Sequence, residues 1–275
     1  MKWIVRIVTG LVVAMVVMII ALAGVIYWDT QFGVSASDFT NASYTAEGGT
    51  TLNGYLAQPE GEGPFPGVLM VHEWWGLNAE IIELADELAE EGYVVLAPDT
   101  YRGPTAAQIP GALYLRLSID MERVDADMRS AYDYLASLDN VAENIGVVGF
   151  CYGGDVAMNH AIDNPEIDAT INLYGSTLAD STAYGALLED GASPVLGIFG
   201  AEDQGIPVDS VNAYEAALNE AGVTNTVTIY DGMGHAFVQP DAIEEDGAPR
   251  EAWLQILDFF EAQLATDAPE SSTES

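Results

Sequence analysis

The 275-residue sequence predicts an α/β fold, with a mostly parallel central sheet, helices on both sheet faces and one N-terminal transmembrane helix in front. Three observations lead to this prediction. Short apolar runs of the kind that buried parallel strands need alternate with helical patterns. The N-terminal segment is long and uncharged. The remaining length suits a single core of ~200–250 residues.

Residues 1–28 are predicted to anchor the chain in a membrane. After Arg6 they carry no charge and are long enough to cross a ~30 Å hydrocarbon core as a helix. Lys2 and Arg6 at the start place the N-terminus in the cytoplasm and the rest outside, by the positive-inside rule. The alternative is a cleaved signal peptide, because Val34-Ser35-Ala36 resembles a cleavage site. We expect a single-pass protein of the cell membrane, or a secreted one if the segment is cleaved.

The charge balance excludes several classes of partner. The chain has 43 Asp and Glu against seven Lys and Arg, a formal net charge of −36. Binding of nucleic acid or anionic lipid needs clustered basic residues, so neither is expected as a partner. The acidic residues are spread among well-formed apolar patterns, which is typical of a folded surface rather than a disordered chain. We interpret this surface as an adaptation to high salt, where screening over ~3 Å at 1 M makes the self-repulsion tolerable.

The sequence divides into a short polar linker over residues 29–42, one domain over residues 43–265, and a disordered acidic tail over residues 266–275. Expected strands are 51–58, 67–72, 93–97, 145–150, 169–173, 195–199 and 226–230. Expected helices are 78–91, 121–138 with Asp120 as a possible N-cap, 156–162, 208–221 and 250–264.

A nucleophile is predicted where the strand 145–150 ends. Gly149-Phe150-Cys151-Tyr152-Gly153 is the G-x-S-x-G elbow with Cys in place of Ser. In so tight a turn, side chains at Gly149 and Gly153 would collide with the backbone. Cys151 then stands at a helix N-terminus, which favours a thiolate, and the N–H of Tyr152 can stabilise an oxyanion. The alternative, a cysteine that is simply a small buried hydrophobe, does not explain the strand, glycines and helix together.

A base and an acid are expected at the ends of later strands. His235 lies in a glycine-rich loop after the last predicted strand, and Asp203 follows the strand 195–199. Asp203 would hold the imidazole in the right tautomer and stabilise its charged form, with Glu202 as the alternative acid. No metal or organic cofactor is implied, since one cysteine cannot build a metal cage and the histidines lack ligand spacing.

Five motifs in order resemble the dienelactone hydrolase family of the α/β-hydrolases, over roughly residues 43–264. This resemblance implies a Cys151–His235–Asp203 triad. It also implies that Glu73 contacts the resting thiol and swings away as substrate arrives, and that the N–H of Trp74 joins that of Tyr152 in the oxyanion hole. The motifs are VHEWWGLN at 71–78, GYVVLAPDTYRG at 92–103, GFCYGG at 149–154, GAEDQGIP at 200–207 and GMGHAF at 232–237.

The resemblance is weaker for substrate binding. Family members that cleave anionic lactones hold the substrate carboxylate with arginines, one of them four residues past the histidine, where this chain has Gln239. Arg102, which follows Tyr101, lies close to the position of another. Tyr101, Arg102 and Gln239 are therefore the candidate substrate-binding residues, with Arg116 and Arg123 as further possibilities.

The function implied by the resemblance is hydrolysis of a small carboxylic ester or lactone, as by a carboxymethylenebutenolidase, through a Cys151 acyl-enzyme. Two alternatives stay open at this point. One is a thioesterase or small peptidase on the same fold. The other is a non-catalytic exported binding protein on a hydrolase scaffold. The sequence does not indicate an oligomeric state.

Overall fold

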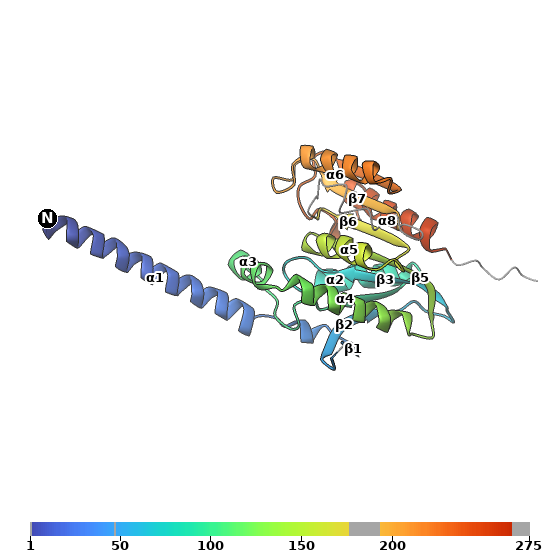
Figure 1. Ribbon diagram of the computed structural model, residues 1–275, viewed down its shortest axis with the longest axis horizontal. Coiled ribbons are helices and arrows are strands. Elements are labelled where there is room, and N and C mark those ends of the chain that lie inside the picture. The colour runs from blue at the N-terminus through green and yellow to red at the C-terminus, as the bar shows by residue number, and fades with distance from the viewer. Residues whose placement is uncertain (1, 47, 176–192, 266–275) are drawn as a thin grey trace, which may run out of the picture.

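The computed structural model describes residues 2–46, 48–175 and 193–265. The acidic tail expected over residues 266–275 lies outside this range. The described part of the domain is built around one sheet of eight strands (Figure 1). The strands are β1 Ala42–Thr45, β2 Thr51–Ala57, β3 Phe65–Val71, β4 Val94–Pro98, β5 Val141–Phe150, β6 Ala169–Leu173, β7 Val195–Gly200 and β8 Asn225–Tyr230.

The sheet has the strand order β1-β2-β4-β3-β5-β6-β7-β8. The β1–β2 and β2–β4 pairs are antiparallel, and all later pairs are parallel. The predicted mostly parallel sheet is therefore confirmed. The parallel strands β3, β5, β7 and β8 end at the same edge, which is where sheets of this kind carry their chemistry.

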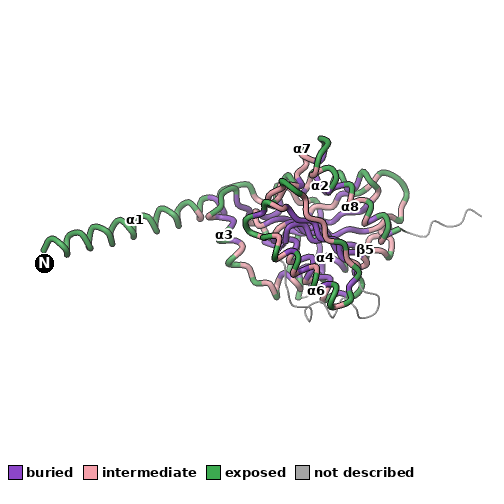
Figure 2. Tube along the Cα trace, turned by 90° about the horizontal axis from the view of Figure 1, so that it is seen from above, coloured by how far each residue is buried: buried purple, intermediate pink, exposed green. Residues whose placement is uncertain are grey.

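Helices cover both faces of the sheet (Figure 2). Within the domain they are α2 Ala79–Glu90, α3 Ile109–Ser118, α4 Met121–Ala136, α5 Tyr152–Asp163, α6 Val208–Ala221, α7 Pro240–Ile243 and α8 Ala248–Leu264. Helices α2, α7 and α8 lie on one side, and α4 and α6 lie on the other, with α5 packed against α4. Because both faces are covered, β4 and β7 are buried along their whole length.

The expected strands and helices are present, with small shifts at their ends. Asp120 caps α4 as expected, its side chain accepting a hydrogen bond from the N–H of Glu122. Four of the described elements were not predicted, namely β1, α3, α7 and a short 3-10 helix over Ala36–Asp38. Strand β1 and helix α7 have only four residues each, too few for a periodic pattern to stand out.

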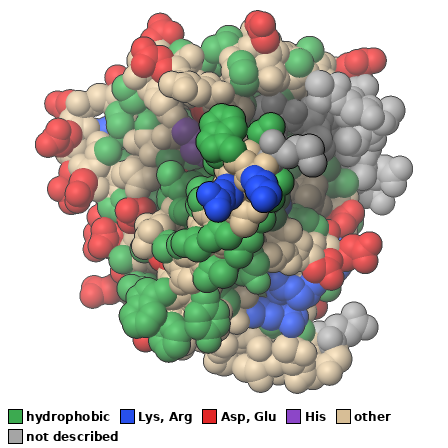
Figure 3. Space-filling view, turned by 90° about the vertical axis from the view of Figure 1, so that its left-hand side faces the viewer, with side chains coloured by type: hydrophobic (Ala, Val, Ile, Leu, Met, Phe, Trp, Pro, Cys, Tyr) green, Lys and Arg blue, Asp and Glu red, His purple; other side chains and the backbone are tan. Residues whose placement is uncertain are grey.

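The N-terminal segment forms the 31-residue helix α1, Lys2–Phe32, which projects from the domain (Figures 1 and 3). It is long and apolar enough to cross a membrane, and its apolar window is fully exposed. Residues 29–42, expected as a linker, continue this helix to Phe32. Asp29 is buried, and its carboxylate is satisfied by hydrogen bonds from the N–H groups of Ala107 and Gln108, both 3.1 Å away. The end of α1 is thereby docked on the segment that leads into α3.

Candidate active site

The turn between β5 and α5 forms the elbow that the glycine pattern predicts. Cys151 has φ 54° and ψ −114°, a left-handed backbone that is strained for a residue with a side chain. A Cβ at Gly149 would overlap the Gly153 carbonyl, and a Cβ at Gly153 would overlap the Val71 carbonyl on β3. These clashes confirm why both flanking positions are glycine. The turn presents Cys151 at the N-terminus of α5.

The loops after β7 and β8 bring an imidazole and a carboxylate together. Nδ1 of His235 donates to Oδ2 of Asp203 over 2.6 Å. The other carboxylate oxygen of Asp203 accepts from the N–H groups of Gly205, at 2.7 Å, and Ile206, at 3.1 Å. Glu202, the alternative acid, is exposed. The partner of His235 is therefore Asp203, and a proton on Nδ1 leaves Nε2 free to accept another.

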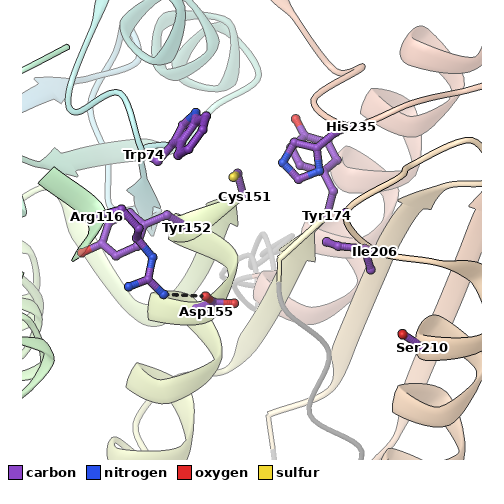
Figure 4. Close-up of a pocket in the computed structure, with 10 residues that line it drawn as sticks. Trp74, Arg116, Cys151, Tyr152, Asp155, Tyr174, Ile206, Ser210 and His235 are labelled. Carbon is purple, nitrogen blue, oxygen red and sulfur yellow. Dashed lines mark hydrogen bonds and ion pairs between the residues drawn. The ribbon is translucent and has the colours of Figure 1, made fainter. Parts of the chain in front are cut away.

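A cavity of about 370 Å³ lies at this edge of the sheet. It brings together four of the residues predicted for the site, Cys151, His235, Trp74 and Tyr152, while Asp203 lies behind His235. Figure 4 shows the side chains of Trp74 and His235 on opposite sides of the Cys151 sulfur. The lining residues are Trp74, Arg116, Cys151, Tyr152, Asp155, Tyr174, Gly205, Ile206, Ser210 and His235.

The surroundings of Cys151 keep its thiol protonated. Burial, followed by the charge of Glu73, raises the pKa of Cys151 to about 12, while the backbone N–H groups of Tyr152 and Trp74 lower it. The helix dipole alone predicts a thiolate, but burial and the nearby carboxylate outweigh it. The two amides that lower the pKa of the thiol are those that the resemblance implies for the oxyanion hole.

Glu73 is itself buried, with 6% of its surface exposed, and its Oε1 has no hydrogen-bond partner among the described residues. Burial, followed by the charge of Glu80, raises the pKa of Glu73 to about 7. Glu73 lines a second cavity, shared with Glu80 and Gln239, rather than the Cys151 cavity. Its carboxyl group can therefore change its charge near neutral pH while it lies close enough to influence the thiol.

A buried network behind the cavity was not found from the sequence. His72 donates from Nδ1 to the Glu73 carbonyl over 2.6 Å, and its Nε2 accepts from the Thr100 hydroxyl over 2.8 Å. Thr100 in turn accepts from the Tyr152 hydroxyl over 3.3 Å. Burial lowers the pKa of His72 to about 4, so the ring is neutral and offers one donor and one acceptor. The only signal in the sequence is that His72 follows a strand that ends at the same edge as the elbow.

The candidate substrate-binding residues lie outside the lining of the Cys151 cavity. Arg102 forms two hydrogen bonds with Asp127, at 2.9 and 2.7 Å, and Arg123 contacts the same carboxylate at 2.8 Å. Tyr101 is buried, with its ring 5.4 Å from that of Tyr152. Gln239 lines the second cavity. A substrate-binding role for Tyr101, Arg102 and Gln239 stays a prediction.

Arg116 is the arginine that lines the Cys151 cavity. Its guanidinium lies 3.4 Å from the Asp155 carboxylate and 5.2 Å from the centre of the Tyr152 ring (Figure 4). Arg116 comes from α3, which the sequence pattern did not reveal. The position of this helix therefore sets the position of a positive charge in the cavity.

Comparison with known proteins places the chain in a family. The model of the dienelactone hydrolase family matches residues 52–264. The chain is 33% identical over 229 residues to "Putative carboxymethylenebutenolidase" of Aquifex aeolicus, covering 78% of this chain and 95% of that one. It is 32% identical over 226 residues to "Protein usf" of Aquifex pyrophilus, with the same two coverages.

Among solved structures, a Klebsiella pneumoniae protein titled "Putative Dienelactone Hydrolase" superposes with a TM-score of 0.68 at 28% identity. The superposition covers 80% of this chain and 99% of that one. The match to the family model runs from β2 to α8 and therefore includes the loops that carry the cavity. The chain therefore belongs to the dienelactone hydrolase family, as a hydrolase of the α/β-hydrolase fold.

Proposed function

We propose that this protein hydrolyses a carboxylic ester or lactone through an acyl-enzyme on Cys151. The observation that carries the proposal is the shared cavity, in which the thiol, an imidazole paired with a buried carboxylate, and two backbone N–H groups converge. Relatives named "Putative carboxymethylenebutenolidase" support a lactone among the candidate substrates.

In the proposed reaction, Nε2 of His235 removes the Cys151 proton and the thiolate attacks the substrate carbonyl. The N–H groups of Tyr152 and Trp74 stabilise the oxyanion. The C–O bond to the alkoxide then breaks, and the imidazolium returns its proton to the alkoxide, which in a lactone stays attached to the acyl chain. Water, deprotonated by His235, attacks the thioester and releases the acid. Asp203 stabilises the imidazolium in both halves.

The resting thiol needs a trigger, because its raised pKa opposes proton transfer to an imidazole. We assign this role to Glu73, because its charge adds to the effect of burial in raising the pKa of Cys151. A substrate that displaces the Glu73 carboxylate or excludes water around it would remove that charge from the neighbourhood of the sulfur. The thiolate would then form only when an ester is bound.

The experiment uses the full chain in detergent and molar salt, with short aryl esters and a panel of neutral and anionic lactones. We expect hydrolysis, together with a transient mass increase of one acyl group on Cys151. A Cys151→Ala variant should lose both. Slow iodoacetamide labelling of Cys151 that is equally slow in a His235→Ala variant would count against an activated thiol. Absence of product from every ester and lactone would exclude the proposal.

The length and apolar composition of the N-terminal helix support a membrane location for this activity. We propose that residues 1–28 anchor the protein in the cell membrane and that the domain over residues 43–265 lies on the extracytoplasmic side. Membrane fractions should retain the full chain after a high-salt wash, and protease added outside intact cells should degrade the domain. N-terminal sequencing that finds a mature protein beginning after Ala36 would replace the anchor with a cleaved signal.

The acidic surface supports a high-salt environment. Screening reduces the repulsion among the 43 acidic residues, so we propose that the melting temperature rises between low and molar salt. Sodium chloride and potassium chloride at equal ionic strength test this by thermal unfolding. A melting temperature that stays constant or falls would contradict the adaptation.

A further inference from the structure

Helix α3 carries an apolar face that the described residues of the domain do not cover. Its buried residues, Gly111, Ala112 and Leu115, face the domain. On the remaining face lie four exposed apolar side chains. These are Ile109, 63% exposed, Leu113, 45%, Tyr114, 50%, and Leu117, 76%. Scattered surface leucines need no explanation, but a helix with apolar residues on both faces does.

Nearly all of the large apolar side chains that are exposed outside α1 lie on this face or next to it. Outside α1, the large hydrophobic side chains exposed in the described residues are these four, Val34, which precedes the domain, and Leu254 on α8. Five of the six therefore gather near the end of α1. Figure 3 looks from the side on which α1 projects. In that view α1 points toward the viewer, so the hydrophobic side chains at its centre include those of α1, and acidic side chains lie mainly around the edge.

The distribution of charge points to the same place. The two longest stretches without Asp or Glu are residues 1–28 and residues 100–119, which contain most of α1 and all of α3. These two segments meet in the structure, because α1 packs on α3 and Asp29 accepts from the N–H groups of Ala107 and Gln108. In a chain with a net charge of −36, one of the two longest acid-free segments therefore packs against the helix that is long enough to span a membrane.

The uncovered face of α3 is also connected to the catalytic cavity. Arg116, next to Leu117, reaches back into that cavity, where it contacts Asp155 and the Tyr152 ring. Because Arg116 belongs to the helix on which α1 packs, the cavity lies next to the part of the domain from which α1 projects.

We propose that the exposed face of α3 lies in the interfacial layer of the bilayer that α1 spans, so that the Cys151 cavity takes esters or lactones of amphiphiles held in that bilayer. This inference rests on the proposed ester hydrolysis and on α1 as an anchor. An apolar helix face of this kind sits at the boundary between headgroups and acyl chains. Neutral lipid is the expected surface, because the acidic domain is repelled by anionic headgroups.

The first test measures the depth of α3 in the full chain, reconstituted in phosphatidylcholine nanodiscs. In a Cys151→Ser background, an environment-sensitive dye is attached at Leu117→Cys, at Leu254→Cys on α8 as matched control, or at Val16→Cys inside α1. We expect nitroxide-labelled lipid to quench the dye at positions 16 and 117 and not at 254. Aqueous iodide should quench most strongly at 254.

The outcomes separate the proposals. Quenching by lipid at position 16 but not at 117, with equal iodide quenching at 117 and 254, would overturn the membrane contact of α3 and leave the anchor intact. Protection from iodide at 117 without lipid quenching would also overturn it, because a second copy of the chain would then cover the face. Loss of lipid quenching at both 16 and 117 would overturn the anchor as well.

The second test measures the substrate class with Cys151 intact. A Leu113→Ser/Leu117→Ser variant is compared with Leu254→Ser on two aryl esters, a soluble acetate and a long-chain ester dissolved in the nanodisc. We expect the α3 variant to lose about tenfold in rate on the long-chain ester and to keep its acetate rate, because its two leucines no longer bury apolar surface in lipid. Equal loss on both esters, or no loss on either, would overturn the proposed substrate class. A wild-type chain that cleaves neither ester would instead refute the hydrolase proposal, while the dye still reports the position of α3.

Discussion

The two halves of the cavity are held in opposite ways. On the nucleophile side, Cys151 is fixed by a strained backbone turn, and its thiol is buried beside the carboxyl group of Glu73. On the base side, the His235 side chain is 38% exposed and is positioned by one short hydrogen bond to Asp203, which is 2% exposed. Backbone geometry holds the first group, and a side-chain partner holds the second.

This difference indicates what a substitution does in each half. Near Cys151, a changed side chain alters the pKa of the thiol, because the position of the sulfur is set by the glycines of the elbow. Near His235, a changed partner alters the tautomer and orientation of the ring, because the imidazole is held by its hydrogen bond to Asp203 and by packing against the ring of Tyr174. The three predictions that follow test this division.

The largest effect is expected on the base side. Asp203→Asn should lower kcat/KM about 10⁴-fold, since an amide can donate to Nδ1 and would stabilise the tautomer that cannot accept the Cys151 proton. Steady-state hydrolysis of an aryl ester measures the loss. The matched control is Glu202→Gln, the adjacent exposed acid, which should change kcat/KM less than about twofold. Equal losses in the two variants would show that the hydrogen bond to His235 does not govern catalysis.

The sequence was most informative where local geometry demands particular residues. Gly149 and Gly153 could be interpreted from sequence because any side chain there meets backbone, a constraint that acts within one turn and its neighbouring strand. The sequence favoured Asp203 but left Glu202 open as the alternative, because both lie in the same loop. In the structure, the choice depends on the N–H groups of Gly205 and Ile206, which hold the Asp203 carboxylate inward.

Helix α3 could not be predicted for a different reason. A helix is recognised when apolar residues follow one face, but α3 has apolar residues on both faces and a proline and a glycine near its start. Its position, and with it that of Arg116, depends on the end of α1 and on Asp155, both distant in sequence. The hydrogen-bonded link from His72 through Thr100 to Tyr152 could not be predicted for the same reason, because its members are also distant in sequence.

A smaller effect is expected on the nucleophile side. Glu73→Gln removes a negative charge that raises the pKa of Cys151, so iodoacetamide should label the thiol faster, by about tenfold for each pKa unit that the thiol loses. The pKa of Glu73 is about 7, so its carboxyl is neutral well below that pH. The difference between variant and wild type should therefore appear above pH 7 and shrink as the pH falls.

The control is Glu83→Gln, an exposed acid that lines the second cavity with Glu73. It should leave the labelling rate unchanged at every pH. Faster labelling in both variants would assign the effect to the general acidic field. A Glu73→Gln variant that labels like wild type at pH 8 would show that burial alone controls the thiol, and the trigger would have to be sought elsewhere.

The smallest effect on rate is expected for the buried histidine behind the cavity. It tests whether the hydrogen bonds of His72 help to position the nucleophile side of the site. His72 and His160 are both buried, and burial lowers the pKa of each to about 4. A lowered pKa means that each neutral ring stabilises the folded protein by up to about 3 kcal/mol above pH 6.5. This stability is lost as the pH falls through 4. His72→Gln and His160→Gln should therefore each flatten the dependence of unfolding free energy on pH, measured by urea titration.

Only His72 contacts the Glu73 carbonyl and Thr100, so only His72→Gln should lower kcat, by about three- to tenfold, through displaced amides at Trp74 and Tyr152. A matching fall in kcat for His160→Gln would mean that lost stability lowers the rate, and that the nucleophile half needs no support beyond its own backbone.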